Sequence, residues 1–403
     1  MKQIIRSTSF KRACVVFVLL FFVMTNQGKL SADENQAKTS DEDLVKKLDQ
    51  LSAKIERLEG KVQDLDEKLS AKNALEISGF FDVSFSNYKN KPNVFAMGNL
   101  ELDLEHSYDN KFQVAAALVF DDENGTYLGV GLIDYAFIGG PVPPRGRLFI
   151  ERGLHIQVGR FDVPLGNDWN YVSAVNRITV TPPLTTSNLM EGVYNDVGIR
   201  VLYSAVALNF SLYSTHGIEK QYSYGGISYG TRIGLTPFNN PYTIKQQSTP
   251  VFELGFSYLY DIDNQGEKSE QVIAVDYESK SGPLILRSEY YNREKTVGVV
   301  FEGYHLTSGL DFQNINSSPF IIFLRYDYHL EKNNVITSDD TAATEAAAEG
   351  ESLSRITGGV KFNISNTSFL KLEYHTYLTA AERFREDAYF AESLYYAQLV
   401  ITF

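Results

Sequence analysis

Charged side chains recur at every second position in several segments of the chain, with apolar residues between them. In one such segment Glu101, Asp103 and Glu105 alternate with leucines, and in another Lys361 has an apolar residue on each side. Residues two apart in a β-strand share a face, so each segment would present one charged and one apolar face. Charges on such a face need water around them. They could then act electrostatically on passing ions, which requires no covalent chemistry.

Nine of these side chains are expected to line a water-filled interior. They are Glu101, Asp103, Glu105, Asp196, Arg200, Arg287, Arg325, Lys361 and Lys371. The acidic members cluster early in the chain and the basic members are biased towards its later part. One hypothesis is that two oppositely charged walls set up a transverse electric field. For any single residue, the simpler interpretation is that it is one of many charges in a solvated wall.

Histidines are the other residues that could do chemistry. The chain has 6, and His155, His216, His305, His329 and His375 lie in or near expected strands. None of them accompanies a Gly-x-Ser-x-Gly motif, and no phosphate-binding loop, His-Glu-x-x-His motif or EF-hand loop occurs. We therefore expect no enzyme activity, no catalytic residue, no cofactor and no metal site, although a barrel enzyme with a Ser/His/acid arrangement remains an alternative.

The elements that must position these charges are strands. From Leu75 onward, alternating segments of roughly 9–11 residues follow one another with turns between them. Counted from both ends, the segments meet only if a weaker strand runs through about Tyr224–Leu235. The prediction is an all-β fold over 74–403, a transmembrane antiparallel β-barrel of about 16 strands, with 14 or 18 as alternatives. A barrel must close, because an open sheet edge in lipid would leave backbone groups without hydrogen bonds.

The last segment supports a membrane barrel. Every second residue from Tyr395 to Phe403 is apolar, and the chain ends on that aromatic residue. This ending resembles the closing strand of bacterial outer-membrane barrels. The chain has no run of 18 apolar residues, yet it is 43% hydrophobic and 13% aromatic. That composition fits strands that are apolar on one face only. The net charge of −13 argues against nucleic acid as a partner.

The N-terminal segment is expected to be removed. Basic residues precede an apolar core at 13–24, and Leu30-Ser31-Ala32 offers a cleavage site, so 1–32 is predicted to be a signal peptide. The chain's one cysteine, Cys14, lies within it. The mature protein would then hold no disulfide and no thiolate metal site.

Residues 33–73 are predicted to contain a short α-helical coiled coil. Apolar residues follow one another at alternating spacings of four and three, as in the seam of a coiled coil. The seam consists of Leu44, Leu48, Leu51, Ile55, Leu58, Val62, Leu65 and Leu69. β-Branched residues at one seam position with leucine at the other lean towards a dimer. An amphipathic helix lying on its own barrel is the alternative.

A long segment at about 161–192 is the third connection on the expected outer side. The end of the preceding strand and the start of this segment read Gly159-Arg160-Phe161-Asp162-Val163-Pro164-Leu165-Gly166, and the next strand opens with Asn195-Asp196-Val197-Gly198. Both stretches, together with the plan of signal, coil and barrel, resemble the phosphate-selective porin O/P family. The resemblance implies a porin, in which this loop folds inward and narrows a channel for passive diffusion. Its constriction residues would be Arg160, Asp162, Asp168, Trp169, Arg177 and Glu191.

The resemblance also implies a location and partners. The barrel would lie in the outer membrane of a Gram-negative-type bacterium, with the coil in the periplasm, and would form a homotrimer through barrel and coil. Small hydrophilic solutes would pass through it, and peptidoglycan or another periplasmic partner could bind the coil. The acid-rich wall favours weak or mildly cation-leaning selectivity over phosphate selectivity. A plugged or structural barrel that tethers the membrane is the alternative function.

Overall fold

The chain forms two compact units, Met1–Leu69 and Ser70–Phe403. The computed structural model describes residues 54–55, 57–58, 75–88, 93–109, 111–121, 125–140, 153–167, 171, 173–189, 195–205, 207–217, 226–237, 251–263, 265–296, 298–333, 350–380 and 394–403. In the first unit the four described residues are helical, and Ile55 and Leu58 are exposed there. The predicted signal peptide and the other six seam residues lie outside the described residues, so both remain predictions.

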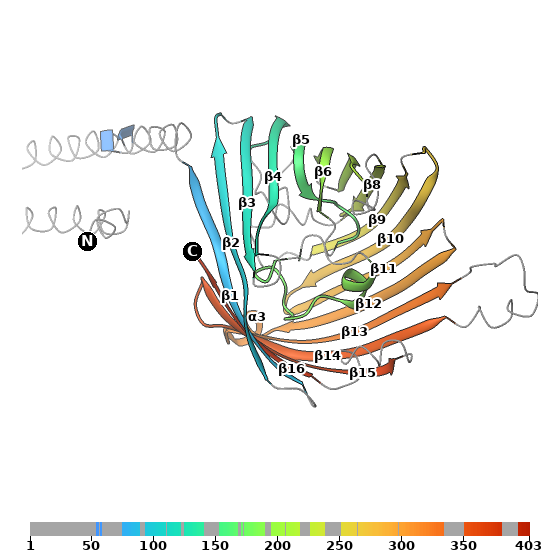
Figure 1. Ribbon diagram of the computed structural model, residues 1–403. Coiled ribbons are helices and arrows are strands. Elements are labelled where there is room, and N and C mark those ends of the chain that lie inside the picture. Colours follow the sequence, from blue (N-terminus) through green and yellow to red (C-terminus); the bar gives the residue numbers. More distant parts are fainter. Residues whose placement is uncertain are drawn as a thin grey trace, which may run out of the picture. The chain divides into compact units, whose positions relative to one another are not determined.

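Sixteen strands make up the second unit (Figure 1). The first eight are β1 (Glu76–Tyr88), β2 (Val94–Ser107), β3 (Phe112–Asp121), β4 (Gly125–Ile138), β5 (Gly153–Asp162), β6 (Asn195–Ser204), β7 (Leu208–Thr215) and β8 (Ile227–Leu235). The other eight are β9 (Val251–Ile262), β10 (Lys268–Ser281), β11 (Leu284–Lys295), β12 (Val299–Asp311), β13 (Phe320–Asn333), β14 (Glu351–Asn363), β15 (Ser368–Ala380) and β16 (Leu394–Thr402).

These strands close into a barrel in chain order. Each strand pairs antiparallel with its neighbours, and β1 pairs with β16, where Phe80 lies opposite Thr402. Closure leaves no strand edge without a partner. The prediction of sixteen antiparallel strands is confirmed, including the weaker one, which is β8 (Ile227–Leu235).

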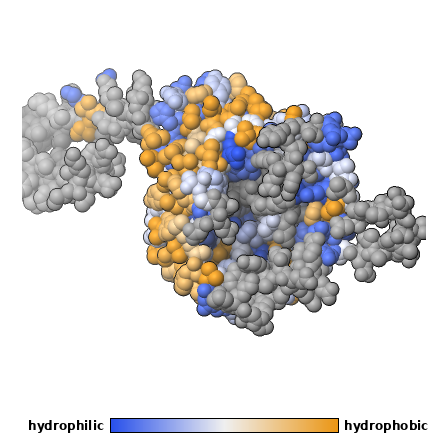
Figure 2. Space-filling view, viewed as in Figure 1, coloured by the Kyte–Doolittle hydropathy of each residue, from blue (hydrophilic) through white to orange (hydrophobic). Residues whose placement is uncertain are grey.

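The two faces of the wall differ as the alternation predicts. In β3 the inward-facing Ala115 and Ala117 are buried, and Ala116 between them lies on the outer face. Large apolar side chains are exposed on the outer face, among them Leu324 at 57% and Leu372 at 50%. Figure 2 shows such side chains gathered over the outside of the wall where the first strands lie in Figure 1. An apolar outside around a polar inside is the arrangement that lipid requires.

The outer face changes from aromatic to charged within two residues. Tyr290, Tyr304 and Tyr328 lie side by side on β11, β12 and β13. Next to them on the same face, Lys332 forms an ion pair with Glu302 at 2.9 Å. Tyrosine rings concentrate at the water interfaces of a membrane, so this row marks one boundary of the apolar band.

The connections differ at the two ends of the barrel. The end of the barrel that holds the start of β1 and the end of β16 is called the terminal end. There, two residues join β10 to β11, and a turn that contains the short helix α3 (Gln313–Asn316) joins β12 to β13. At the opposite end, called the far end, 32 residues, 163–194, join β5 to β6. Part of this connection forms the short π-helix η3 (Thr185–Leu189).

Among the described residues, no helix has both the length and the apolar character needed to cross a membrane.

Candidate functional site

The described residues 163–167, 171 and 173–189 follow β5 and lie inside the barrel; they are called the inner loop. Strand β5 runs to Asp162, so the loop begins two residues later than the predicted 161. Its residues contact the inward faces of strands far away in the sequence, and η3 packs near β11, β12 and β13. The inner loop therefore crosses the lumen.

The first part of the inner loop is fixed to β8, β9 and β11. The Gly166 N–H donates to Ser257 Oγ at 3.0 Å, and Arg232 Nε donates to the Gly166 carbonyl at 2.7 Å. The Asn167 N–H donates to Glu289. Gly166 has a φ of +65°, and a Cβ added there would meet the Glu289 carboxylate. Only glycine fits this conformation and this close approach.

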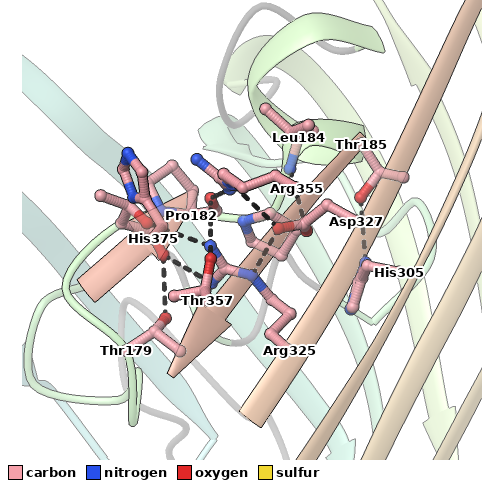
Figure 3. Close-up of polar contacts among 12 residues, drawn as sticks. Thr179, Pro182, Leu184, Thr185, His305, Arg325, Asp327, Arg355, Thr357 and His375 are labelled. Carbon is pink, nitrogen blue, oxygen red and sulfur yellow. Dashed lines mark hydrogen bonds and ion pairs between the residues drawn. The ribbon is translucent and has the colours of Figure 1, made fainter. Parts of the chain in front are cut away.

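The second part is fixed by two arginines that share one carboxylate (Figure 3). Asp327 accepts from Arg325 Nε at 2.9 Å and from Arg355 Nε at 3.0 Å. The same two guanidinium groups donate to the inner loop, Arg325 to the Thr181 carbonyl at 2.8 Å and Arg355 to the Pro182 carbonyl at 2.9 Å. All three wall side chains are buried, so one carboxylate compensates two guanidinium charges in part, and the loop carbonyls accept their remaining N–H groups.

A second charged group lies on β15. Glu373 accepts from the Val180 N–H at 2.7 Å, and Lys371 Nζ donates to the Ala174 carbonyl at 2.6 Å and the Thr179 carbonyl at 3.1 Å. Wall carboxylates thus accept from loop N–H groups, and wall cations donate to loop carbonyls. The inner loop gains hydrogen bonds for its backbone that a strand or helix would otherwise provide.

Hydroxyl and histidine groups also meet under the inner loop. Thr185 Oγ1 lies 2.9 Å from His305 Nδ1, and His305 lies opposite Asp327 in the β12–β13 register. Asp327, however, is bonded to two arginines, and both Thr185 and His305 are buried. The pair links the inner loop to β12. Within the described ranges, no three His, Cys, Asp or Glu residues are grouped to hold a metal ion.

Apolar side chains pack inside the barrel as well. Val163 and Leu165 of the inner loop join a cluster with Phe161, Leu259 and Tyr291. A separate cluster contains Phe80, Phe369, Val400 and the inner-loop residue Ala174. Both clusters lie on the inward side of the wall, so the lumen is partly filled by dry contacts.

All nine predicted wall residues face inward, but they fall into two groups. Five are buried: Glu101, Asp196, Arg200, Arg325 and Lys371. Four are partly exposed: Asp103, Glu105, Arg287 and Lys361. Of the buried group, Arg325 and Lys371 hold the inner loop. Arg200 donates to Gln157 Oε1 at 2.6 Å and to the Asp162 carbonyl at 2.7 Å, where the loop begins.

The predicted constriction residues are distributed differently. Asp162 is buried and accepts from Asn195 Nδ2 at 3.0 Å, and Arg177 lies on the inner loop and is partly exposed. Arg160 lies opposite Val197, whose side chain is exposed on the outer face, and donates to Asn195. Arg160 therefore points outward. Asp168, Trp169 and Glu191 lie outside the described residues.

Two arginines of the wall that hold the inner loop are absent from the predicted set. Arg232 lies on β8, where it forms ion pairs with Glu253 at 2.8 Å and Asp276 at 2.6 Å. Its alternation with Thr231 and Ile233 was the available signal. Arg355 follows a register shift between Ser354 and Arg355, which breaks the alternation that would assign its face.

Neither a family model nor a curated protein matches the sequence. Solved structures do share the fold. OmpF of Salmonella typhi, in complex with daunomycin, has a TM-score of 0.56 at 10% identity and covers 83% of this chain and 99% of its own. The anion-selective porin of Comamonas acidovorans has a TM-score of 0.53 at 12% identity and covers 82% of this chain and 98% of its own. The trimer form of OmpT, an outer membrane protein of Vibrio cholerae, has a TM-score of 0.54 at 10% identity and covers 82% of this chain and 99% of its own. The chain therefore has the fold of these outer-membrane barrels.

Proposed function

We propose that this chain is an outer-membrane porin that lets small hydrophilic solutes and ions diffuse through a water-filled channel. The observation that carries the proposal is a closed sixteen-strand barrel with an apolar outside, a charged inside and a loop that crosses the lumen. Charged inward faces are stable in a membrane barrel because water reaches them. The proposed role is not enzymatic and involves no cofactor.

Selectivity would depend on the charges that water still reaches. Arg325 and Lys371 are occupied by the inner loop, so they contribute little to a field in the water. The partly exposed wall charges are two carboxylates on β2, Asp103 and Glu105, and two cations, Arg287 on β11 and Lys361 on β14. Acidic and basic groups thus lie on different strands, which supports a transverse field across the channel.

The assembly is proposed from the sequence and from a similar fold. The similar Vibrio cholerae protein is described in a trimer form. We propose a homotrimer in the outer membrane, with the helical segment of 33–73 in the periplasm as a coiled coil. The same segment could contact peptidoglycan or another periplasmic partner. The barrel would be surrounded by outer-membrane lipid.

A planar-bilayer recording of refolded protein tests the proposal. Ohmic steps that close in threes are expected for a trimeric pore. The reversal potential under a salt gradient gives the ion preference. The two dry clusters favour one second candidate, a plugged barrel with a structural role. A folded, heat-modifiable protein that conducts no current would refute the porin and favour the plug.

A further inference from the structure

We propose that the outer face of β10 to β13 holds a docking site for a membrane lipid whose head group is a phosphorylated sugar. The site is a group of polar side chains near the far end, called the rim patch. It consists of Lys268, Gln271, Asn292, Glu294, Glu302 and Lys332. The inference rests on the proposed function, because it takes the far end to face outward from the outer membrane.

The rim patch lies on the outward face, directly beyond the row of tyrosines. Asn292 comes two residues after Tyr290 on β11, and Glu302 comes two residues before Tyr304 on β12. Asn292 and Glu302 lie opposite one another in the register, as the two tyrosines do. Tyrosine rings concentrate at the membrane–water interface. Side chains one step further towards the far end therefore lie at the depth of the lipid head groups.

Glu302 organises the first half of the rim patch. Its carboxylate accepts from Lys332 Nζ at 2.9 Å and from Asn292 Nδ2 at 3.3 Å. The Lys332 side chain is 39% exposed and that of Glu302 is 30% exposed. An ammonium group carries three N–H donors, and the contact with Glu302 uses one of them. Lys332 can therefore also donate to the oxygens of a phosphate at the surface.

Glu294 organises the second half in the same way. Its carboxylate lies 3.5 Å from Lys268 Nζ and accepts from Gln271 Nε2. Gln271 and Glu294 lie opposite one another in the register, and both charged side chains are partly exposed. Ion pairs this exposed add little to the stability of a fold. Stability therefore does not account for two such groups side by side.

On β8 and β9 the same depth of the outer face is apolar. Beyond Tyr229 on β8 the next outward residue is Ile227, and beyond Tyr260 on β9 it is Ile262. A general need for polar groups at the membrane boundary would place them on these strands as well. The rim patch is instead a local feature, as a binding site would be.

The chemical groups of the rim patch indicate what kind of head group fits. Its two ammonium groups can donate to phosphate oxygens, in charge-assisted hydrogen bonds. Its two carboxylates can accept from hydroxyl groups, and its two amides can donate or accept. A head group that offers phosphate alone would leave the carboxylates next to like charge. A sugar that carries phosphate supplies partners for both.

Lipid A, a glucosamine disaccharide lipid with two phosphates, tests the site on the refolded protein in detergent. Native mass spectrometry gives the apparent Kd for lipid A and for phosphatidylglycerol, a phosphate-bearing lipid without a sugar. Lys268→Gln/Lys332→Gln removes both ammonium groups of the rim patch. Lys280→Gln/Lys295→Gln is the matched control. It removes the same charge from two lysines that are partly exposed but face inward.

The parent protein should bind lipid A on the order of tenfold more tightly than phosphatidylglycerol. The rim-patch variant should lose this difference, and the inward control should keep it. Lys332→Gln alone should lose part of it, so the test does not depend on the folding of the double variant. Unchanged lipid A binding by the rim-patch variants, or an equal loss in the inward control, would overturn the site. Equal binding of the two lipids by the parent would overturn the assignment of a sugar head group.

The binding measurement does not depend on conduction. If the protein carries no current but lipid A binding depends on Lys268 and Lys332, the lipid site stands and the porin proposal fails. If the protein conducts and the rim-patch variant binds lipid A as the parent does, the porin proposal stands and the lipid site fails.

Discussion

Asp327→Asn removes the carboxylate that two buried arginines share under the inner loop. Asp327 is bonded to Arg325 Nε at 2.9 Å and to Arg355 Nε at 3.0 Å, and its side chain is 0% exposed. Loss of one partner from a buried ion pair costs about 3–5 kcal/mol, because the remaining charge is left uncompensated. The asparagine oxygen can still accept one hydrogen bond, so the lower end of this range, about 3 kcal/mol, is expected.

The assay is denaturant unfolding of the refolded barrel, followed by tryptophan and tyrosine fluorescence. The variant should unfold at a clearly lower denaturant concentration than the parent. Its inner loop should also detach more often, since Thr181 and Pro182 are held by the same two arginines. Single-channel recordings should then show noisier current.

Glu302→Gln is the matched control, because Glu302 lies on β12 of the same strand pair and contacts Lys332 at 2.9 Å with both side chains partly exposed. A pair of this kind contributes only about 0–1 kcal/mol. If Asp327→Asn and Glu302→Gln shift the unfolding midpoint equally, the claim that the buried group fixes the inner loop is refuted. Adding Arg355→Gln to Asp327→Asn should cost less than the sum of the two single changes, because the two residues share one interaction.

Two further outcomes follow from the same contacts. Gly166→Ala should destabilise the barrel by roughly 1–3 kcal/mol, because φ is +65° and the new Cβ would collide with Glu289. Gly282→Ala is the control and should cost less, because Gly282 has a φ of +54° but nothing lies within 4 Å of the added Cβ. Equal unfolding midpoints for the two variants would contradict this expectation. Lys361→Glu should shift the reversal potential towards cation preference and Asp103→Lys towards anion preference, because both side chains face inward and are partly exposed. Arg232→Gln is the buried control and should leave the ion preference unchanged. A shift for Arg232→Gln as large as that for Lys361→Glu would contradict the division into exposed and buried wall charges.

The sequence predicted the wall of the barrel because the wall depends on local periodicity. Alternation along each strand decides which side chains face lipid and which face the lumen, and this needs no long-range information. The nine predicted wall residues all face inward for this reason. Closure then required an even number of strands, and the weak strand β8 had to exist even though its own pattern was faint.

The same local rule gave the wrong expectation at strand ends. Arg160 was placed in the constriction because it was taken to lie in the loop, yet β5 continues to Asp162 and Arg160 keeps the outward face that Val158 has. Arg355 was missed because the register shifts beside it. One inserted residue reverses every face beyond it, so a periodic pattern alone does not detect such a change.

The tertiary structure decided which inward charges water can reach. Arg325 and Arg200 look alike in sequence, each a single arginine in an alternating segment. Arg325 is buried because a loop residue 144 positions away in the chain, Thr181, lies against it, and Arg200 because its guanidinium group supports the start of the same loop. The sequence determined the strands, their faces and the barrel, since each depends on neighbours along the chain. The path of the inner loop depends on contacts between distant segments, and so only the folded barrel determines where a channel can run.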